Sequence, residues 1–133
     1  MTLVDSHIIL DIATNGSRWA DWSQLQLERA SLAGPLVIND IIYADVSVRY
    51  EFIEDLDAAL DTLQTRLEAM PREALFLAAK VYRQYRARGG TRAGALSDFF
   101  IGAHAAVADY TLLTRGLVRY RSYFPTIRMI FPD

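Results

Sequence analysis

The sequence predicts an α/β fold in which helices flank a mainly parallel sheet of four to five strands. Two observations carry this prediction. Short, continuously apolar runs recur along the chain, as is typical of strands that are buried on both faces of a parallel sheet. Longer stretches with apolar residues spaced three and four apart separate these runs and indicate amphipathic helices. Strands joined through helices imply right-handed crossovers between parallel neighbours.

The N-terminal residues predict a strand followed by helical segments. A buried strand over residues 3–5 is expected to end at Asp5, before the apolar burst of residues 8–10. Ser17 is expected to cap a helix over residues 19–30, and Gly34-Pro35 is expected to stop it.

The same order of strand and helix follows at once. The run Leu36-Val37-Ile38 predicts a second strand, and Asn39 or Asp40 supplies an N-cap for a helix over residues 41–50 that carries Asp45.

Two further amphipathic helices are expected between residues 53 and 88. They separate near Met70-Pro71, where Pro71 takes an early helical position, and Gly89-Gly90 ends the second of them.

The C-terminal third predicts one more helix and two strands. Ser97 is expected to cap a helix over residues 98–108, while residues 111–114 and 127–131 form the third and fourth strands. The full predicted order is β-α-α-β-α-α-α-α-β-α-β.

Composition limits the classes of function. The 133 residues, of which 52% are hydrophobic and 23% charged, fit one domain over residues 1–133. The net charge of −2 provides no overall basic field for nucleic acid, so any RNA contact must be local. The absence of cysteine excludes disulfides and thiolate zinc sites. No apolar run reaches the length of a membrane span, so we expect a soluble, cytoplasmic protein without a membrane partner.

Three aspartates are the candidate ligands of a metal ion. Asp5 ends the first strand, Asp45 lies on the helix after the second, and Asp98 begins a later helix. Ligand sites of open parallel sheets gather at the carboxyl ends of strands. Few basic residues stand beside these acids in the sequence, so Mg²⁺ or Mn²⁺ is the natural partner of their carboxylates.

Each aspartate also has a simpler interpretation. Asp98 can be a helix cap or a partner of the helix dipole, Asp5 a polar turn residue, and Asp45 a solvated position on an amphipathic helix. Taken one residue at a time, these alternatives stay open.

Four segments together resemble the motifs of PIN-domain toxins of the VapC type. They are Leu3-Val4-Asp5-Ser6, Ile42-Tyr43-Ala44-Asp45-Val46-Ser47, Asp98-Phe99-Phe100-Ile101-Gly102-Ala103-His104-Ala105 and Leu113-Thr114-Arg115-Gly116. The resemblance covers nearly the whole chain, and it implies a single PIN-like domain with a three-layer sandwich fold.

The resemblance also implies a function. It implies an endoribonuclease, the toxin of a type II toxin–antitoxin system, that hydrolyses RNA with Mg²⁺ or Mn²⁺ held by Asp5, Asp45 and Asp98. Thr114 and, more weakly, Ser6 match positions that support this pocket, although Thr114 is equally well explained as a β-branched strand residue. The implied partners are the RNA substrate, a cognate antitoxin protein and a second copy of the chain in a homodimer.

Two positions depart from the family pattern. Asp45 stands where the family usually has Glu, which withdraws the carboxylate by one methylene. Gly116 stands where an Asp is common, so one carboxylate is absent. The alternative function is therefore a catalytically weakened PIN-fold module that binds RNA or an antitoxin.

Other polar residues are open to two interpretations. His7 is expected beside the pocket, as a substrate contact or a surface histidine, whereas His104 should face away from Asp98 on the same helix. Two groups of arginines could contact an RNA backbone or simply be solvated: Arg83, Arg86, Arg88 and Arg92, and Arg115, Arg119 and Arg121.

Overall fold

Five strands form one sheet in which every neighbouring pair is parallel. This is seen in a computed structural model that describes residues 1–14 and 18–133. The strand order is β3-β2-β1-β4-β5. The strands are β1 (Thr2–Val4), β2 (Leu36–Ile38), β3 (Thr65–Leu67), β4 (Thr111–Leu113) and β5 (Met129–Ile130). The predicted α/β fold with a parallel sheet is confirmed.

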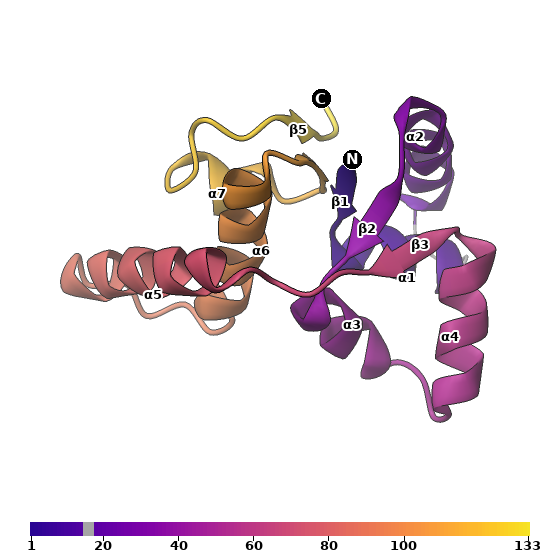
Figure 1. Ribbon diagram of the computed structural model, residues 1–133, viewed down its shortest axis with the longest axis horizontal. Coiled ribbons are helices and arrows are strands. Elements are labelled where there is room, and N and C mark those ends of the chain that lie inside the picture. Colours follow the sequence, from indigo (N-terminus) through magenta and orange to yellow (C-terminus); the bar gives the residue numbers. More distant parts are fainter. Residues whose placement is uncertain (15–17) are drawn as a thin grey trace.

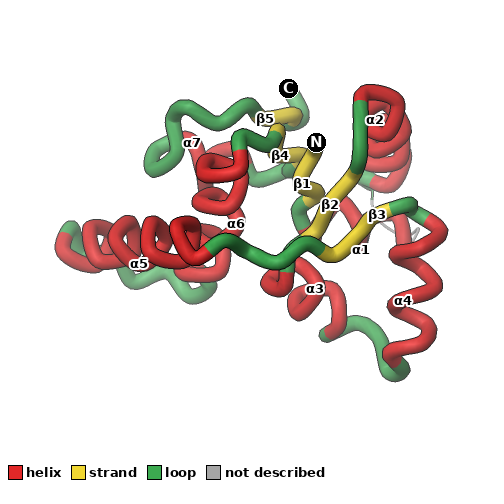
Figure 2. The backbone as a smooth tube through the Cα atoms, in the orientation of Figure 1, coloured by secondary structure: helices red, strands yellow, loops and turns green. Residues whose placement is uncertain are grey.

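Helices cover both faces of this sheet. Figure 1 shows α5, α6 and α7 on one side of the strands and α1, α2 and α4 on the other, and Figure 2 shows the same layers. The helices are α1 (Ser6–Thr14), α2 (Ala20–Ala33), α3 (Asp40–Ser47), α4 (Ile53–Thr62), α5 (Arg72–Ala87), α6 (Ala95–Ala108) and α7 (Leu117–Arg121). The three layers explain why all residues of β1 and β2 are buried and nearly all are apolar.

Strand β3 is an element that the sequence analysis did not anticipate. It pairs with β2 alone, at one edge of the sheet, and only Thr65 among its residues is buried. An edge strand needs no continuous apolar run, and its exposed Arg66 is a typical edge residue. The strand therefore leaves little trace in the hydrophobic pattern.

Several predicted helix ends are corrected by the structure. Ser17 lies outside the described residues, and α2 begins after Trp19, which makes no side-chain cap. Pro71 is the N-cap of α5 rather than a helical residue. Ser97 lies inside α6, which begins after Gly94 in a left-handed conformation (φ 81°). That conformation suits glycine, so Gly94 and not Ser97 turns the chain into the helix.

Other boundaries are close to those predicted. Asn39 caps α3 as expected, because its side chain accepts a hydrogen bond from the Ile42 N–H at 3.0 Å. Helix α3 ends at Ser47 rather than at residue 50. Strands β4 and β5 are shorter than predicted, and β1 is shifted by one residue, so that Asp5 follows it instead of belonging to it.

The strand order creates a crevice at the carboxyl ends of β1 and β4. From β1 the chain moves to β2 and β3 on one side, and from β4 it moves to β5 on the other. Ligands of open parallel sheets bind where the direction of the connections reverses in this way. Within residues 1–14 and 18–133, no helix has the length and apolar character needed to span a membrane.

Candidate active site

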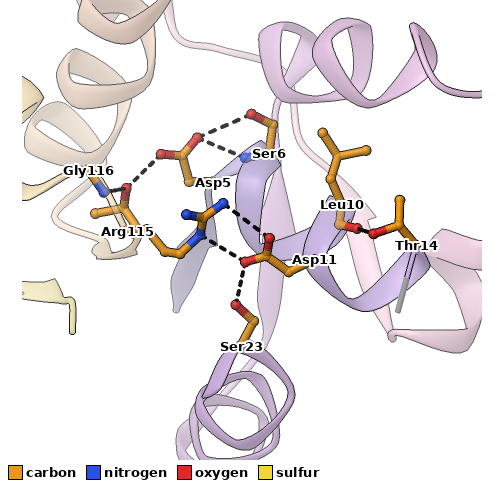
Figure 3. Close-up of polar contacts among 9 residues, drawn as sticks. Asp5, Ser6, Leu10, Asp11, Thr14, Ser23, Arg115 and Gly116 are labelled. Carbon is orange, nitrogen blue, oxygen red and sulfur yellow. Dashed lines mark hydrogen bonds and ion pairs between the residues drawn. The ribbon is translucent and has the colours of Figure 1, made fainter. Parts of the chain in front are cut away.

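The carboxylate of Asp5 directly follows the central strand β1, at this end of the sheet, and is almost fully buried. Its Oδ1 accepts a hydrogen bond from the Ser6 N–H at 2.8 Å. Its Oδ2 accepts hydrogen bonds from the hydroxyls of Thr114 at 2.7 Å and Tyr120 at 2.9 Å. Figure 3 shows Asp5 between Ser6 and the segment that contains Gly116. These donors compensate a buried charge that would otherwise be costly.

Thr114 links two parts of the site. It follows β4, and its buried hydroxyl donates to Asp5 while accepting a hydrogen bond from the Gly116 N–H at 2.9 Å. The hydroxyl thereby fixes the turn after β4 against the end of β1. Its use of both hydrogen-bonding capacities goes beyond what a β-branched strand residue requires.

Asp45 approaches Asp5 from helix α3 and is half-buried. Burial raises the pKa of Asp45, and the negative charges of Asp5 and Asp98 raise it further, while a hydrogen bond from Ser6 and the charge of His7 lower it. The Ser6 hydroxyl also lies 3.4 Å from Oδ1 of Asp5. The structure therefore brings the three sequence-predicted aspartates within range of one another's charge, with Ser6 between two of them.

Asp98 lies in the first turn of α6 and has a basic partner. The Arg92 Nη1 is 2.7 Å from its Oδ2, and only 14% of the Asp98 side chain is exposed. Few basic residues stand directly beside the aspartates in the sequence, but the inference that a metal ion is therefore the natural partner of Asp98 does not allow for Arg92. Arg92 precedes Asp98 by six positions, and the loop between α5 and α6 places its guanidinium against the first turn of α6.

Asp45, Asp98 and Arg92 border one open groove of about 340 Å³, which therefore carries charges of both signs. Its lining residues are Ser6, His7, Leu10, Asp45, Arg92, Ala93, Gly94, Ser97, Asp98 and Arg119. His7 thus lies beside the acids, as expected from the sequence. His104 lies elsewhere, buried with its Nδ1 3.1 Å from the Asn39 amide nitrogen, in agreement with its exclusion from the metal site.

The side chain of Arg119 occupies the space next to Gly116. A Cβ atom added at Gly116 would lie 3.0 Å from Cδ and 3.2 Å from Nε of Arg119. A position where the family often has an acid is therefore adjacent to a cation in this protein.

The donor set matches the chemistry of a hard divalent cation. Carboxylates are preferred ligands of Mg²⁺ and Mn²⁺, and Mg²⁺ is often held by only one or two of them together with water. In the arrangement of the described residues, no group of three His, Cys, Asp or Glu side chains is placed to bind a metal ion. Arg92 pairs with Asp98, and both oxygens of the buried Asp5 accept hydrogen bonds, so Asp45, which lines the groove and forms no ion pair with a cation among the described residues, is the most available of the three carboxylates.

Tyr120 was not identified from the sequence, although its hydroxyl contacts Asp5. The side chain is fully buried on α7. Burial raises the pKa of Tyr120 well above its usual value, and the neighbouring charge of Asp5 raises it further, so the phenol stays a hydrogen-bond donor. An aromatic residue in a short helix gives no signal of this role in the sequence.

A buried ion pair beside the site was also missed. Arg115 Nε lies 2.8 Å from Oδ2 and its Nη2 3.1 Å from Oδ1 of Asp11 on α1. The same Asp11 Oδ2 accepts a hydrogen bond from the Ser23 hydroxyl of α2 at 2.8 Å. Figure 3 shows this group next to Asp5. It ties the turn after β4 to both N-terminal helices.

Comparison with solved structures identifies the fold. The chain is similar to a chain of VapBC2 from Rickettsia felis bound to a promoter DNA fragment, with TM-score 0.74, 15% identity, and 99% of this chain and 98% of that one covered. It is similar to a chain of VapBC-1 from nontypeable Haemophilus influenzae, with TM-score 0.71, 17% identity and coverage of 98% and 96%. A toxin–antitoxin complex from Klebsiella pneumoniae gives TM-score 0.66, 19% identity and coverage of 100% and 98%.

These similarities confirm the resemblance to VapC PIN-domain proteins at the level of the fold. No protein-family model and no curated protein matches the sequence. Since fold does not determine function, the activity has to be argued from the site.

Proposed function

We propose that this protein is a Mg²⁺- or Mn²⁺-dependent endoribonuclease and the toxin of a type II toxin–antitoxin system, acting in the cytoplasm as one PIN-like domain over residues 1–133. The observation that carries the proposal is that Asp45 and Asp98 line one groove while the charge of Asp5, buried next to the groove residue Ser6, acts on Asp45; the three acids come from separate parts of the chain. If the three aspartates were unrelated helix caps, turn residues or solvated acids, there would be no reason for them to lie near one another.

The proposed metal ligands are Asp5 and Asp45, with Asp98 available when Arg92 moves away. A bound Mg²⁺ or Mn²⁺ would supply Lewis acidity toward water and the RNA phosphodiester. Ser6, Thr114 and Tyr120 would hold Asp5 in a single orientation, because their donors already engage both of its oxygens. Such support keeps a ligand in place before the ion arrives.

An antitoxin partner is supported by the similar structures. One is a toxin–antitoxin complex, and others are VapBC assemblies bound to DNA. We propose that this chain binds a cognate antitoxin and, from the family resemblance, forms a homodimer. Co-expression with the product of the neighbouring reading frame and light scattering of the purified protein test these two proposals separately.

A second candidate function is the catalytically weakened module that binds RNA or an antitoxin. It is favoured by the glycine at position 116 and by the ion pair that Arg92 makes with Asp98. Gly116→Asp tests it directly. Gly116→Ala is the control, because it adds the same Cβ beside Arg119 without a carboxylate. A large gain in RNA cleavage over Gly116→Ala would favour the weakened module, and no gain over it would favour an enzyme that works with three carboxylates.

Cleavage of total RNA by the purified protein, with and without Mg²⁺ or Mn²⁺, tests the main proposal. Asp5→Asn, Asp45→Asn and Asp98→Asn should each abolish metal-dependent cleavage. Asp45→Asn is the most informative variant. Asp45 is half-buried, so its substitution should destabilise the protein less than substitution of the almost fully buried Asp5. Asp109→Asn is the matched control, because Asp109 is exposed and its left-handed conformation suits Asn. Cleavage that survives chelation or the Asp45 and Asp98 variants would contradict the proposal.

A further inference from the structure

We propose that Arg119 binds a phosphate of the RNA backbone in the acidic groove, through space that Gly116 leaves free. This inference rests on the proposed function for the identity of the ligand. It assigns a substrate-binding role to one arginine among several that the sequence alone could not separate.

Arg119 is set apart by its surroundings. It is half-buried on α7 and lines the groove together with Asp45 and Asp98. In the described part of the chain, no carboxylate lies within ion-pair distance of its guanidinium. Arg92 in the same groove is paired with Asp98, and Arg115 on the preceding turn is paired with Asp11. Arg119 is thus a groove cation with its hydrogen-bonding capacity still free.

Gly116 leaves room for the side chain of Arg119. Its φ of −101° is open to any residue, so the backbone does not demand glycine. A Cβ would instead lie 3.0 Å from Cδ of Arg119, closer than ordinary van der Waals contact. Because position 116 has no side chain, the aliphatic part of Arg119 can pack directly over the turn after β4.

A cation in the groove would offset the repulsion between its aspartates and an RNA phosphate. Asp5 and Asp45, which form no ion pair with a cation in the described part of the chain, repel a phosphodiester, and the net charge of −2 offers no general attraction to RNA. A guanidinium binds phosphate oxygens through paired hydrogen bonds, which suits a single local contact. Arg119 would therefore offset the repulsion where the RNA backbone meets the aspartates.

RNA binding without cleavage tests this proposal. Fluorescence anisotropy is measured with a short, labelled single-stranded RNA of mixed sequence, in EDTA and at several salt concentrations. Arg119→Gln should weaken binding about tenfold, as expected for loss of a hydrogen bond between charged groups. It should also reduce the slope of log K against log salt by about 0.7, the contribution of one phosphate contact in a single strand.

The matched control is Arg121→Gln. Arg121 lies on the same helix and carries the same charge, but it is exposed and its guanidinium lies 5.8 Å from the centre of the Phe131 ring. Its affinity and salt slope should stay at the wild-type values. Equal losses in the two variants, or no loss in Arg119→Gln, would overturn the proposal, and so would a wild-type protein that does not bind RNA.

Gly116→Ala is the second variant, and it changes no charge. The added Cβ makes the stem of Arg119 shift by a few tenths of an ångström, so RNA binding should weaken by less than in Arg119→Gln, and wild-type affinity would overturn the role given to Gly116. Because binding is measured without a divalent ion, the two proposals fail separately. Binding that depends on Arg119 without any metal-dependent cleavage would refute the nuclease alone, whereas cleavage with equal behaviour of both arginine variants would refute this inference alone.

Discussion

The guanidinium of Arg92 lies 2.7 Å from the carboxylate of Asp98, at the groove where a metal ion is proposed to bind. The Tyr85 hydroxyl accepts a hydrogen bond from the Arg92 N–H at 2.6 Å and so holds the loop that presents this arginine. A cation of the protein thus competes with an added cation for one of the three aspartates.

Arg92→Ala should therefore tighten Mn²⁺ binding. The Arg92 side chain is 44% exposed, so solvent screens the pair, and we expect a gain of about two- to fivefold. Isothermal titration calorimetry with MnCl₂ measures it. Arg72→Ala is the control, since it removes an exposed arginine from a pair with Glu73 at the opposite end of α5. Weaker Mn²⁺ binding in Arg92→Ala would mean that Arg92 orients Asp98 for the ion instead of competing with it.

Tyr120→Phe should destabilise the protein and reduce its metal-dependent cleavage. The substitution removes one buried donor from Asp5 and keeps the ring, so we expect a loss of about 1.5–3 kcal/mol in the free energy of unfolding. Urea denaturation gives this value. Tyr123→Phe provides the comparison, because Tyr123 is half-buried and packs its ring 4.9 Å from that of Phe99. The role of the Tyr120 hydroxyl would be refuted by equal stability losses in the two variants.

The pair of Asp11 and Arg115 should show strong coupling. Asp11→Ala leaves a half-buried guanidinium without its carboxylate and should cost about 1–3 kcal/mol, less than a fully buried pair because solvent reaches Arg115. Asp11→Ala combined with Arg115→Met should cost less than the sum of the two single changes. A double-mutant cycle in urea measures the coupling, and additive losses would show that the ion pair contributes little.

The parts of the fold that the sequence predicted are those buried on both sides. Strands β1, β2 and β4 are apolar because helices cover both faces of the sheet, and Asn39 caps α3 through a local hydrogen bond. Such features leave their mark in adjacent residues. The edge strand β3 leaves none, since its outer side meets solvent and its pattern is polar.

The sequence led to three acids that the structure brings near one another, whose role as metal ligands stays a prediction, and it did not lead to the cations beside them. Asp5 follows a strand, Asp98 lies in the first turn of α6 and Asp45 lies further along α3, and the family resemblance joined them into one set. Arg92 and Arg115, the partners of Asp98 and Asp11, are positioned by turns, and the residue pattern does not predict the geometry of these turns. Gly89 and Gly94 turn the chain in left-handed conformations that bring Arg92 back to α6, and Arg115 meets Asp11 across 104 positions.

His104 on α6 is a buried imidazole that responds to pH. Burial lowers its pKa below the usual 6.5, and the charges of Glu68 and Asp40 only partly oppose this shift. The Asn39 amide lies 3.1 Å from its Nδ1, where it can donate only to an unprotonated nitrogen. The neutral ring is therefore the form that the folded protein favours.

Stability should consequently fall as the pH drops below about 6.5. The unfolded chain then binds a proton on His104 that the folded protein resists, and the loss continues until the pH passes below the lowered pKa of the folded state. Above this range His104 contributes no pH dependence. Urea denaturation between pH 8 and pH 5 (roughly the range in which histidine titrates) measures the slope. His104→Gln should flatten it, while His7→Gln, which alters the half-buried histidine beside the groove, should retain it. An unchanged slope in His104→Gln would assign the pH dependence to other groups.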